Sequence, residues 1–273
     1  MTHPIVERLH SVDPSERRAA CRDSVSDPSA TLLVEALGEA LGDSVVEVAR
    51  EASDALARLA REVGGVPEVV HGALRSEVPS RRWFAALTSA RIEPPSARLL
   101  APAVEALASD RKEVRWNAAR LLVDTGRTQP EVFPLVLGLS RGGESPQIRR
   151  MAIFCIRELA PERPESELAL LAACRDSARF VRHAALTALA ALTDPSPQVF
   201  ASLVNVVIDP QDSPARRVAA LALGALAIEH RTLFRETAEP SLRQIASGDA
   251  DNEVRRTVEG VLARLERQPE GSS

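Results

Sequence analysis

One phrase recurs along this chain about every 33 residues, and it constrains the fold more than any other feature. The phrase is an acidic residue, a short gap, an apolar residue, Arg, and then small or aliphatic residues at fixed spacing. Its clearest copy runs from Asp176 through Val181 and Arg182 to Leu192. A fixed period of this length is typical of stacked repeats, in which each unit packs against its neighbours.

The recurring Arg position supplies an index residue for each repeat. The index residues are Ala49, Arg82, Arg115, Arg149, Arg182, Arg216 and Arg255. They are separated by 33, 33, 34, 33, 34 and 39 residues, and a degenerate first copy lies near Arg17 and Arg18. The sequence therefore predicts about eight repeats, and the long final step predicts a wider loop over residues 230–239.

Each repeat is predicted to contain two helices. The first is a short apolar run, such as residues 99–107 or 168–173, and the second carries the index residue. Turn signals precede several second helices, namely Asp13-Pro14, Ser145-Pro146 and Ser213-Pro214. Pro at the first helical position loses no hydrogen bond, and Asp or Ser before it caps the free amides.

The composition fits closely packed helices. The chain has 273 residues, of which 45% are hydrophobic and only 3% aromatic, so its core consists mainly of Ala, Leu and Val. The formal net charge of −4 argues against a general nucleic-acid coat but leaves room for a local basic patch. No run approaches the ~18 apolar residues of a membrane helix. We therefore predict a cytoplasmic protein that does not bind membranes.

The three cysteines, Cys21, Cys155 and Cys174, lack CxxC spacing. They are predicted to be reduced core residues.

The phrase Asp…Val-Arg-x-x-Ala-x-x-Ala-Leu resembles the HEAT-repeat family, in the short bacterial form often called phycobilisome-lyase-type repeats. The absence of Tyr argues against tetratricopeptide repeats, and the ankyrin phrase Thr-Pro-Leu-His is missing. The resemblance implies an all-α, right-handed solenoid that forms a single domain over residues 1–267. Residues 268–273 are predicted to be a disordered tail. In such families the index Arg commonly bridges repeats by pairing with the turn Asp, which implies a structural role for these arginines.

A helical wheel at about 100° per residue separates the faces of the second helices. Counted from the index residue, positions −1, +3, +6, +7 and +10 cluster on the predicted core face. Position +3 is small in six of the seven repeats, where it is occupied by Ala52, Ala85, Ala118, Ala152, Ala185 and Ala219. Small residues there let neighbouring helices approach closely.

Positions +1, +5 and +8 point away from that core. Because second helices line the concave face of the solenoids that the chain resembles, these positions are expected to line a groove. The candidate partner-binding residues are Trp83, Leu87, Trp116, Arg120, Arg150, Phe154, Arg157, His183 and Arg217. Exposed aromatic residues beside Arg are typical of binding surfaces. The alternative is that Trp83 and Trp116 stack on each other and on Arg side chains, which would fill a tightly curved inner face.

Motifs for catalysis and metal binding are missing. The sequence has no HExxH, no Walker loop, no GxGxxG and no Cys/His metal spacing, so we predict no catalytic residue, cofactor or metal. The His-Glu pairs with which deoxyhypusine hydroxylases bind iron do not occur. HEAT-like alkylpurine DNA glycosylases place a carboxylate one turn from a Trp, but Arg120 follows Trp116 and Leu87 follows Trp83.

The favoured function is a non-enzymatic scaffold or adaptor that binds an acidic or amphipathic segment of a protein partner in its groove. Two alternatives stay open. One is a nucleic-acid-binding HEAT-like protein related to alkylpurine DNA glycosylases, and the other is a phycobilin-lyase-like chaperone or lyase. A subunit that only spaces an assembly through its convex helices also fits the sequence.

Overall fold

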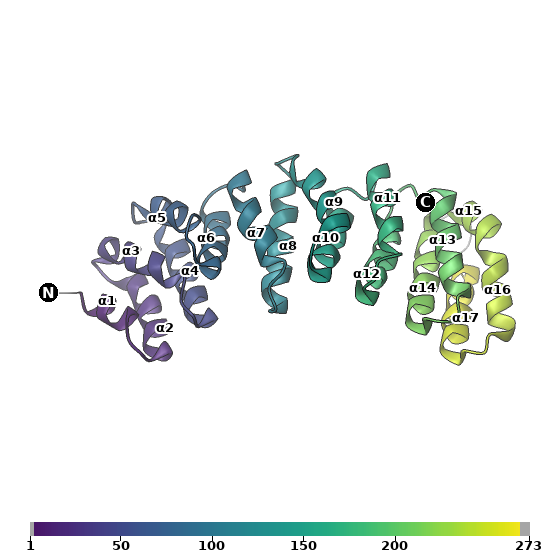
Figure 1. The fold of residues 1–273 in the computed structure, drawn as a ribbon, viewed down its shortest axis with the longest axis horizontal. Helices are drawn as coiled ribbons and strands as arrows, with labels where there is room; N and C mark the ends of the chain where they lie inside the picture. The colour runs from purple at the N-terminus through teal and green to yellow at the C-terminus, as the bar shows by residue number, and fades with distance from the viewer. Residues whose placement is uncertain (1–2, 268–273) are drawn as a thin grey trace. The chain divides into compact units, whose positions relative to one another are not determined.

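The computed structural model describes residues 3–267, and within this range it contains helices and no strands. The contacts divide the chain into two compact units, Met1–Val132 and Phe133–Ser273. In each unit, helix pairs follow one another along the chain (Figure 1). The predicted all-α solenoid of two-helix repeats is confirmed. The prediction for residues 268–273 lies outside the described residues, and the single domain stays a prediction.

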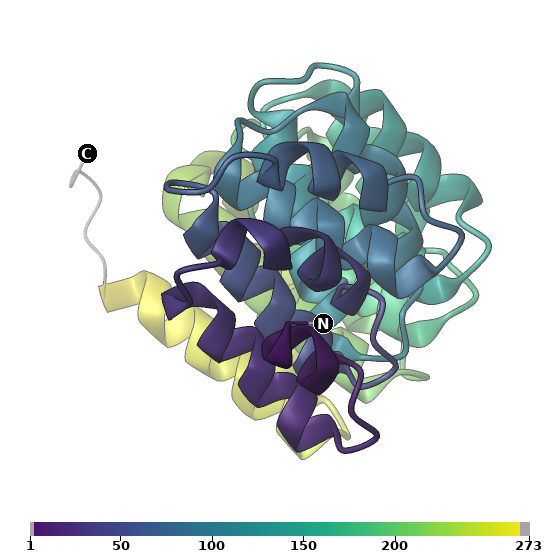
Figure 2. The ribbon, with the colours of Figure 1, turned by 90° about the vertical axis from the view of Figure 1, so that its left-hand side faces the viewer.

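The first unit holds four repeats. Their first helices are α1 (Pro4–Leu9), α3 (Ala30–Ala40), α5 (Val66–Ala73) and α7 (Leu100–Ala106). Their second helices are α2 (Pro14–Asp23), α4 (Val46–Leu59), α6 (Pro79–Ile92) and α8 (Lys112–Gly126). Two 3-10 turns, η1 (Ser24–Ser26) and η2 (Ala97–Leu99), lie in the connections. The turned view shows α1 and α2 nearest the viewer, at the end of this unit (Figure 2).

The second unit holds four more repeats. Their first helices are α9 (Val132–Gly142), α11 (Pro164–Ala173), α13 (Pro197–Ile208) and α16 (Glu239–Gly248). Their second helices are α10 (Pro146–Leu159), α12 (Arg179–Leu189), α14 (Ser213–Glu229) and α17 (Asn252–Arg267). The wide loop predicted over residues 230–239 is wrong, because an additional helix, α15 (Arg231–Thr237), forms there. Its residue Phe234 is buried, so apolar packing stabilises this helix.

The predicted core face of the second helices is confirmed. Every Ala at position +3 is fully buried, and so are Leu56, Leu122, Ile156, Leu189 and Leu223 at position +7. The second helices of the second unit pack side by side, α10 on α12, α12 on α14 and α14 on α17. Between α14 and α17 the approach is close at Gly224, where an added Cβ would lie 2.8 Å from Val261. The spacing of small residues thus sets the distance between repeats.

Replacing Ala185 by Phe is expected to lower the free energy of unfolding by about 1–3 kcal/mol, because α12 has no space for the ring. Ala185 has no exposed surface. Urea denaturation followed by circular dichroism measures the change. Thr187→Phe is the matched control, since Thr187 is exposed on the same helix. Equal stability of both variants would mean that the assigned core face is wrong.

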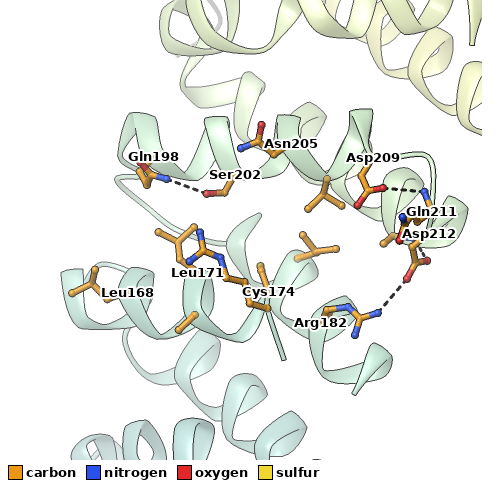
Figure 3. Close-up of a pocket in the computed structure, with 15 residues that line it drawn as sticks. Leu168, Leu171, Cys174, Arg182, Gln198, Ser202, Asn205, Asp209, Gln211 and Asp212 are labelled. Atoms are coloured by element: carbon orange, nitrogen blue, oxygen red, sulfur yellow. Dashed lines mark hydrogen bonds and ion pairs between the residues drawn. The ribbon is translucent and has the colours of Figure 1, made fainter. Parts of the chain in front are cut away.

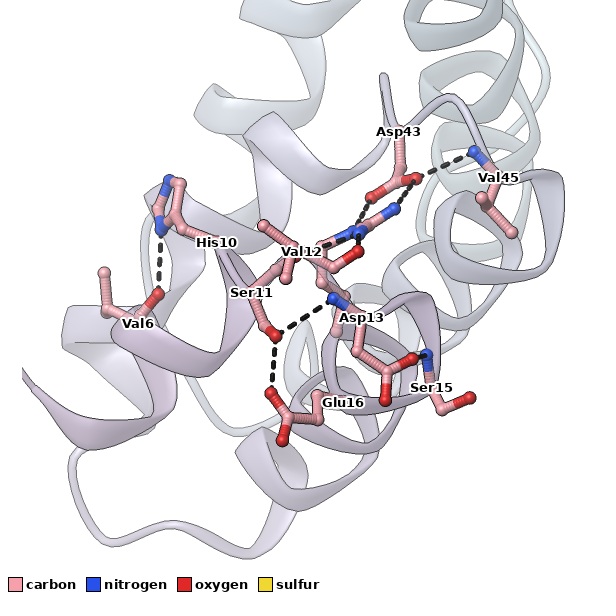
Figure 4. Close-up of polar contacts among 10 residues, drawn as sticks. Val6, His10, Ser11, Val12, Asp13, Ser15, Glu16, Asp43 and Val45 are labelled. Atoms are coloured by element: carbon pink, nitrogen blue, oxygen red, sulfur yellow. Dashed lines mark hydrogen bonds and ion pairs between the residues drawn. The ribbon is translucent and has the colours of Figure 1, made fainter.

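Several Arg–Asp pairs connect neighbouring repeats. In three of them an Arg at or near the index position donates to both carboxylate oxygens, and we call these the arginine clasps: Arg17–Asp43, Arg149–Asp176 and Arg216–Asp249. In the first, shown in Figure 4, Nε and Nη2 of Arg17 donate to the two Asp43 oxygens at 2.6 and 2.9 Å. Arg149 binds Asp176 with the same two distances, and Arg216 also donates to both oxygens of Asp249. Such bidentate, charge-assisted pairs are the strong class of hydrogen bond.

A second contact fixes most index arginines within their own repeat. The Nη1 group donates to the backbone carbonyl six residues earlier, for example from Arg82 to Ser76 at 2.5 Å and from Arg182 to Asp176 at 2.9 Å. The same bond is made by Arg17, Arg115, Arg149 and Arg255. Asp176 therefore binds Arg149 through its carboxylate and Arg182 through its carbonyl, so that the two repeats are joined through one residue.

The predicted pairing with a turn Asp holds for some index arginines and fails for others. Arg149 and Arg216 form clasps, and Arg182 lies 3.5 Å from Asp212. For Arg82 the prediction is wrong, because this residue pairs with Glu105 of α7 at 2.6 Å. The carboxylate position varies because only some turns carry Asp at the position six residues before the index residue.

Candidate functional site

The second-helix face of residues 133–267 is the surface formed by positions +1, +5, +8 and +12 of α10, α12, α14 and α17. Its most unusual part is an exposed apolar stripe on α14. Leu221 is 58% exposed and Ile228 is 43% exposed, while Ala225 between them is also exposed. Residues seven apart on a helix lie on the same side, two turns from each other. An apolar stripe without a cover is a feature of interaction surfaces.

Basic residues lie on the same face at position +1. Arg150 on α10 and Arg256 on α17 are exposed, and neither forms an ion pair within the described part of the chain. Arg217 on α14 donates to Glu253 at 2.5 Å, and His183 on α12 lies 3.6 Å from Asp212. The candidates Arg217 and His183 are therefore engaged within the fold, whereas Arg150 presents an uncompensated positive charge.

Phe154 and Arg157 come together on α10. The Arg157 guanidinium lies 5.2 Å from the centre of the Phe154 ring and donates to Glu158 at 2.5 Å. Both side chains are half-buried. A cation at this distance from a ring is attracted to its face, which holds Arg157 over the aromatic side chain. This pair belongs to the second-helix face, and its role in binding a partner stays a prediction.

In the first unit, the expectation that Trp83 is exposed to solvent is wrong. Trp83 is only 5% exposed, and it lines a cavity of about 470 Å³ together with Phe84, Pro102 and Val114. A ring as large as indole reaches from position +1 to the flank of α6, where it packs against apolar neighbours instead of facing solvent. Trp83 therefore cannot form an aromatic row on the surface with Trp116.

The other candidates of the first unit lie nearer the surface. Trp116 and Leu87 are half-buried, and Arg120 is exposed without an ion pair to any residue in the range 3–267. On α4, Asp54 accepts a hydrogen bond from Arg91 at 2.5 Å, so that a carboxylate also occupies this face. This mixture of charges is less basic than the second-helix face of residues 133–267.

Leu221 and Ile228 are not among the residues that the sequence predicts for the site. Leu221 stands at position +5 and Ile228 at position +12 of the same helix, both among the outward positions of the wheel. Aliphatic residues at two successive outward positions were the signal that could have identified them. The predicted residues include the aromatic ones because aromatic side chains usually dominate interfaces.

The cysteines and the metal-binding residue types add no site. Cys21 and Cys155 are buried as predicted, whereas Cys174 is only partly buried and lines a surface cleft. Burial raises the pKa of the Cys174 thiol to about 12, which keeps it protonated near neutral pH.

Among residues 3–267, no group of three or more His, Cys, Asp and Glu residues is arranged to hold a metal ion. In the same range, no helix has the length and apolar character needed to cross a membrane.

Comparison with solved structures defines the class of protein as an α-solenoid. YibA of Escherichia coli is 16% identical with a TM-score of 0.56, and the match covers 97% of this chain and 92% of that one. Kap121p bound to Ste12p is 15% identical with a TM-score of 0.63, over 96% of this chain and 32% of that one. Importin beta is 15% identical with a TM-score of 0.58, and the match covers 98% of this chain and 41% of that one. This chain thus spans about a third of the length of Kap121p.

Residues 133–224 match the family model of HEAT repeats, in agreement with the resemblance carried by the recurring phrase. None of the curated proteins matches the sequence. Identities below a fifth show the shared fold, in which many functions occur.

Proposed function

We propose that this protein is a non-enzymatic scaffold that binds an acidic, amphipathic segment of a partner protein on the second-helix face of residues 133–267. The observation that carries the proposal is the exposed stripe of Leu221 and Ile228 on α14. The adjacent helix α17 carries Arg256, and α10, one second helix beyond α12, carries Arg150; both are exposed and form no ion pair among residues 3–267. HEAT solenoids commonly mediate protein interaction, and Kap121p has been solved bound to the protein Ste12p.

The geometry favours a helical segment laid across α14. Leu221 and Ile228 are separated by about 10.5 Å along the helix axis, which matches apolar residues seven apart on a partner helix. The small residue Ala190 at position +8 of α12 leaves space beside the stripe. Arg150 and Arg256 then pair with carboxylates on the polar side of the segment, because Arg binds carboxylates in a bidentate manner.

The test is affinity capture with the full chain, followed by binding measurements with the purified captured protein. The double variant Leu221→Asp/Ile228→Asp is expected to weaken this binding at least tenfold, because each buried aliphatic side chain contributes about 1.5–3 kcal/mol. The matched control is Leu32→Asp/Ile208→Asp, which changes exposed aliphatic residues on first helices.

Two results would contradict the proposal. Equal binding by the stripe variant and the control would place the contact elsewhere on the molecule. Loss of all capture after nuclease treatment would favour the nucleic-acid-binding alternative, which also predicts a steep dependence on salt concentration.

A further inference from the structure

A second hollow of about 750 Å³ lies between the first helices α11 and α13, with residues of α12 and α14 at its base (Figure 3). We call it the α11–α13 cleft. It belongs to a different surface from the second-helix face, since first helices form both of its walls. The proposed function above does not use it.

The two walls of the cleft differ in chemistry. The α11 wall is apolar and consists of Leu168, Leu171 and Ala172, of which Leu168 is 62% exposed. The opposite wall is mostly polar: α13 presents Gln198, Ser202 and Asn205 with Val206 beside them, and Asp209 follows the end of the helix. Gln198, Ser202 and Asn205 follow a spacing of four and three, so they lie along one side of α13. Figure 3 shows the two sets of side chains on opposite walls.

The length of the cleft indicates the length of its ligand. Residues 198 to 208 of α13 span roughly 15 Å at 1.5 Å per residue. An extended segment of about five residues has this length, because a strand rises about 3.3 Å per residue.

The polar wall has the hydrogen-bonding groups that an extended backbone needs. Asn205 is exposed and makes no hydrogen bond within residues 3–267, while Gln198 makes only a long contact of 3.4 Å with Ser202. A side-chain amide both donates and accepts, so it satisfies the N–H and C=O groups of a strand that has no partner strand. The amides of Gln198 and Asn205 are two helical turns apart along the cleft.

Charge at one end of the cleft gives the segment a direction. Arg175 lies just after α11, is exposed, and forms no ion pair with another described residue. Its neighbour Arg182 is already bound to the carbonyls of Asp176 and Ser177 and lies near Asp212. Arg175 is thus the cation of this cleft that remains for a ligand carboxylate.

We propose that the α11–α13 cleft binds an extended segment of about five residues from a partner protein. The segment has aliphatic side chains that contact Leu168 and Leu171, and its backbone hydrogen-bonds to Gln198 and Asn205. A carboxylate near one end pairs with Arg175.

The test uses a phage-displayed library of random linear heptapeptides, selected on the full chain and counter-selected on the Ser202→Trp variant, whose indole fills the cleft. Enriched peptides are then synthesised, and their affinities are measured by fluorescence anisotropy. We expect them to be rich in aliphatic residues and to contain Asp or Glu. Their affinity should fall at least tenfold with Ser202→Trp and about tenfold with Gln198→Ala/Asn205→Ala.

Matched variants separate this site from general effects. Ala201→Trp adds the same ring at an exposed neighbouring position of α13, and Gln244→Ala removes an exposed amide from α16; both should leave the affinity unchanged. Leu221→Asp/Ile228→Asp should also have no effect, so failure of one proposal does not imply failure of the other. Melting temperatures show that each variant is folded.

The proposal is overturned if no peptide is enriched on the wild type over Ser202→Trp. It is also overturned if the enriched peptides lose affinity equally with Ala201→Trp, or if circular dichroism shows that they become helical on binding.

Discussion

Replacing Arg216 by Met is expected to lower the free energy of unfolding by about 3 kcal/mol, the low end of the cost of breaking a buried ion pair. The Arg216 side chain is 6% exposed, and it donates to the Val207 carbonyl at 2.6 Å as well as to both oxygens of Asp249. Met retains the apolar part of the side chain but leaves a largely buried carboxylate and a carbonyl without their donor. Urea denaturation of the full chain, followed by circular dichroism at 222 nm, measures the loss.

Arg217→Met is the matched control, because it changes the next residue of α14. Arg217 pairs with Glu253, whose side chain is exposed, and such surface pairs contribute about 0–1 kcal/mol. A loss below 1 kcal/mol for Arg216→Met, equal to that of its neighbour, would mean that the clasp adds nothing beyond a surface ion pair.

Replacing both clasp carboxylates of the second unit, in the variant Asp176→Asn/Asp249→Asn, is expected to cost about 4 kcal/mol at pH 7. Hydrogen bonds to charged groups contribute about 1.5–3 kcal/mol each, and the two clasps share no partner, so their losses add. The hydrogen bonds from Arg149 lower the pKa of Asp176, and those from Arg216 lower the pKa of Asp249.

The lowered pKa values predict how this difference changes with pH. A carboxylate whose pKa is lower in the folded state stabilises the fold above its unfolded pKa of about 3.9, and this stabilisation is lost as the pH falls through the folded pKa. The wild type should therefore lose stability below about pH 4, while its advantage over the double variant shrinks. Denaturation curves at pH 7, 5, 4 and 3 measure it. A difference that stays constant down to pH 3 would show that these carboxylates do not titrate with the fold.

The sequence predicted the fold well because it repeats the same physical constraint in successive repeats. The Ala at position +3 and the aliphatic residue at +7 must be buried wherever second helices stack, so each copy confirms the register of the others. Helix α15 could not be found in this way, because residues 231–237 occur once and have no copy for comparison. In the structure they pack against α13, α14 and α16.

The candidate site was harder to predict, because a helical wheel gives a direction and takes no account of the size of a side chain. Trp83 occupies an outward position, yet its indole ring turns to the flank of α6 and is buried. Arg217 and His183 also lie at outward positions, but carboxylates of neighbouring loops and helices engage them. The α11–α13 cleft depends on the separation of two first helices, which no pattern within one helix encodes.

Because each arginine clasp joins one repeat to the next, a single helix pair cannot be duplicated or exchanged without breaking a clasp. Each clasp joins an Arg to an Asp 26, 27 or 33 residues later, at Asp43, Asp176 and Asp249. A duplication or transplant that cuts in the turn between two repeats therefore carries an unmatched Arg at one end and an unmatched Asp at the other. A segment inserted into this chain keeps the clasps at its ends only when it supplies the missing Arg and the missing Asp. The order of its repeats is thus constrained by charge matching as well as by the shape of the core.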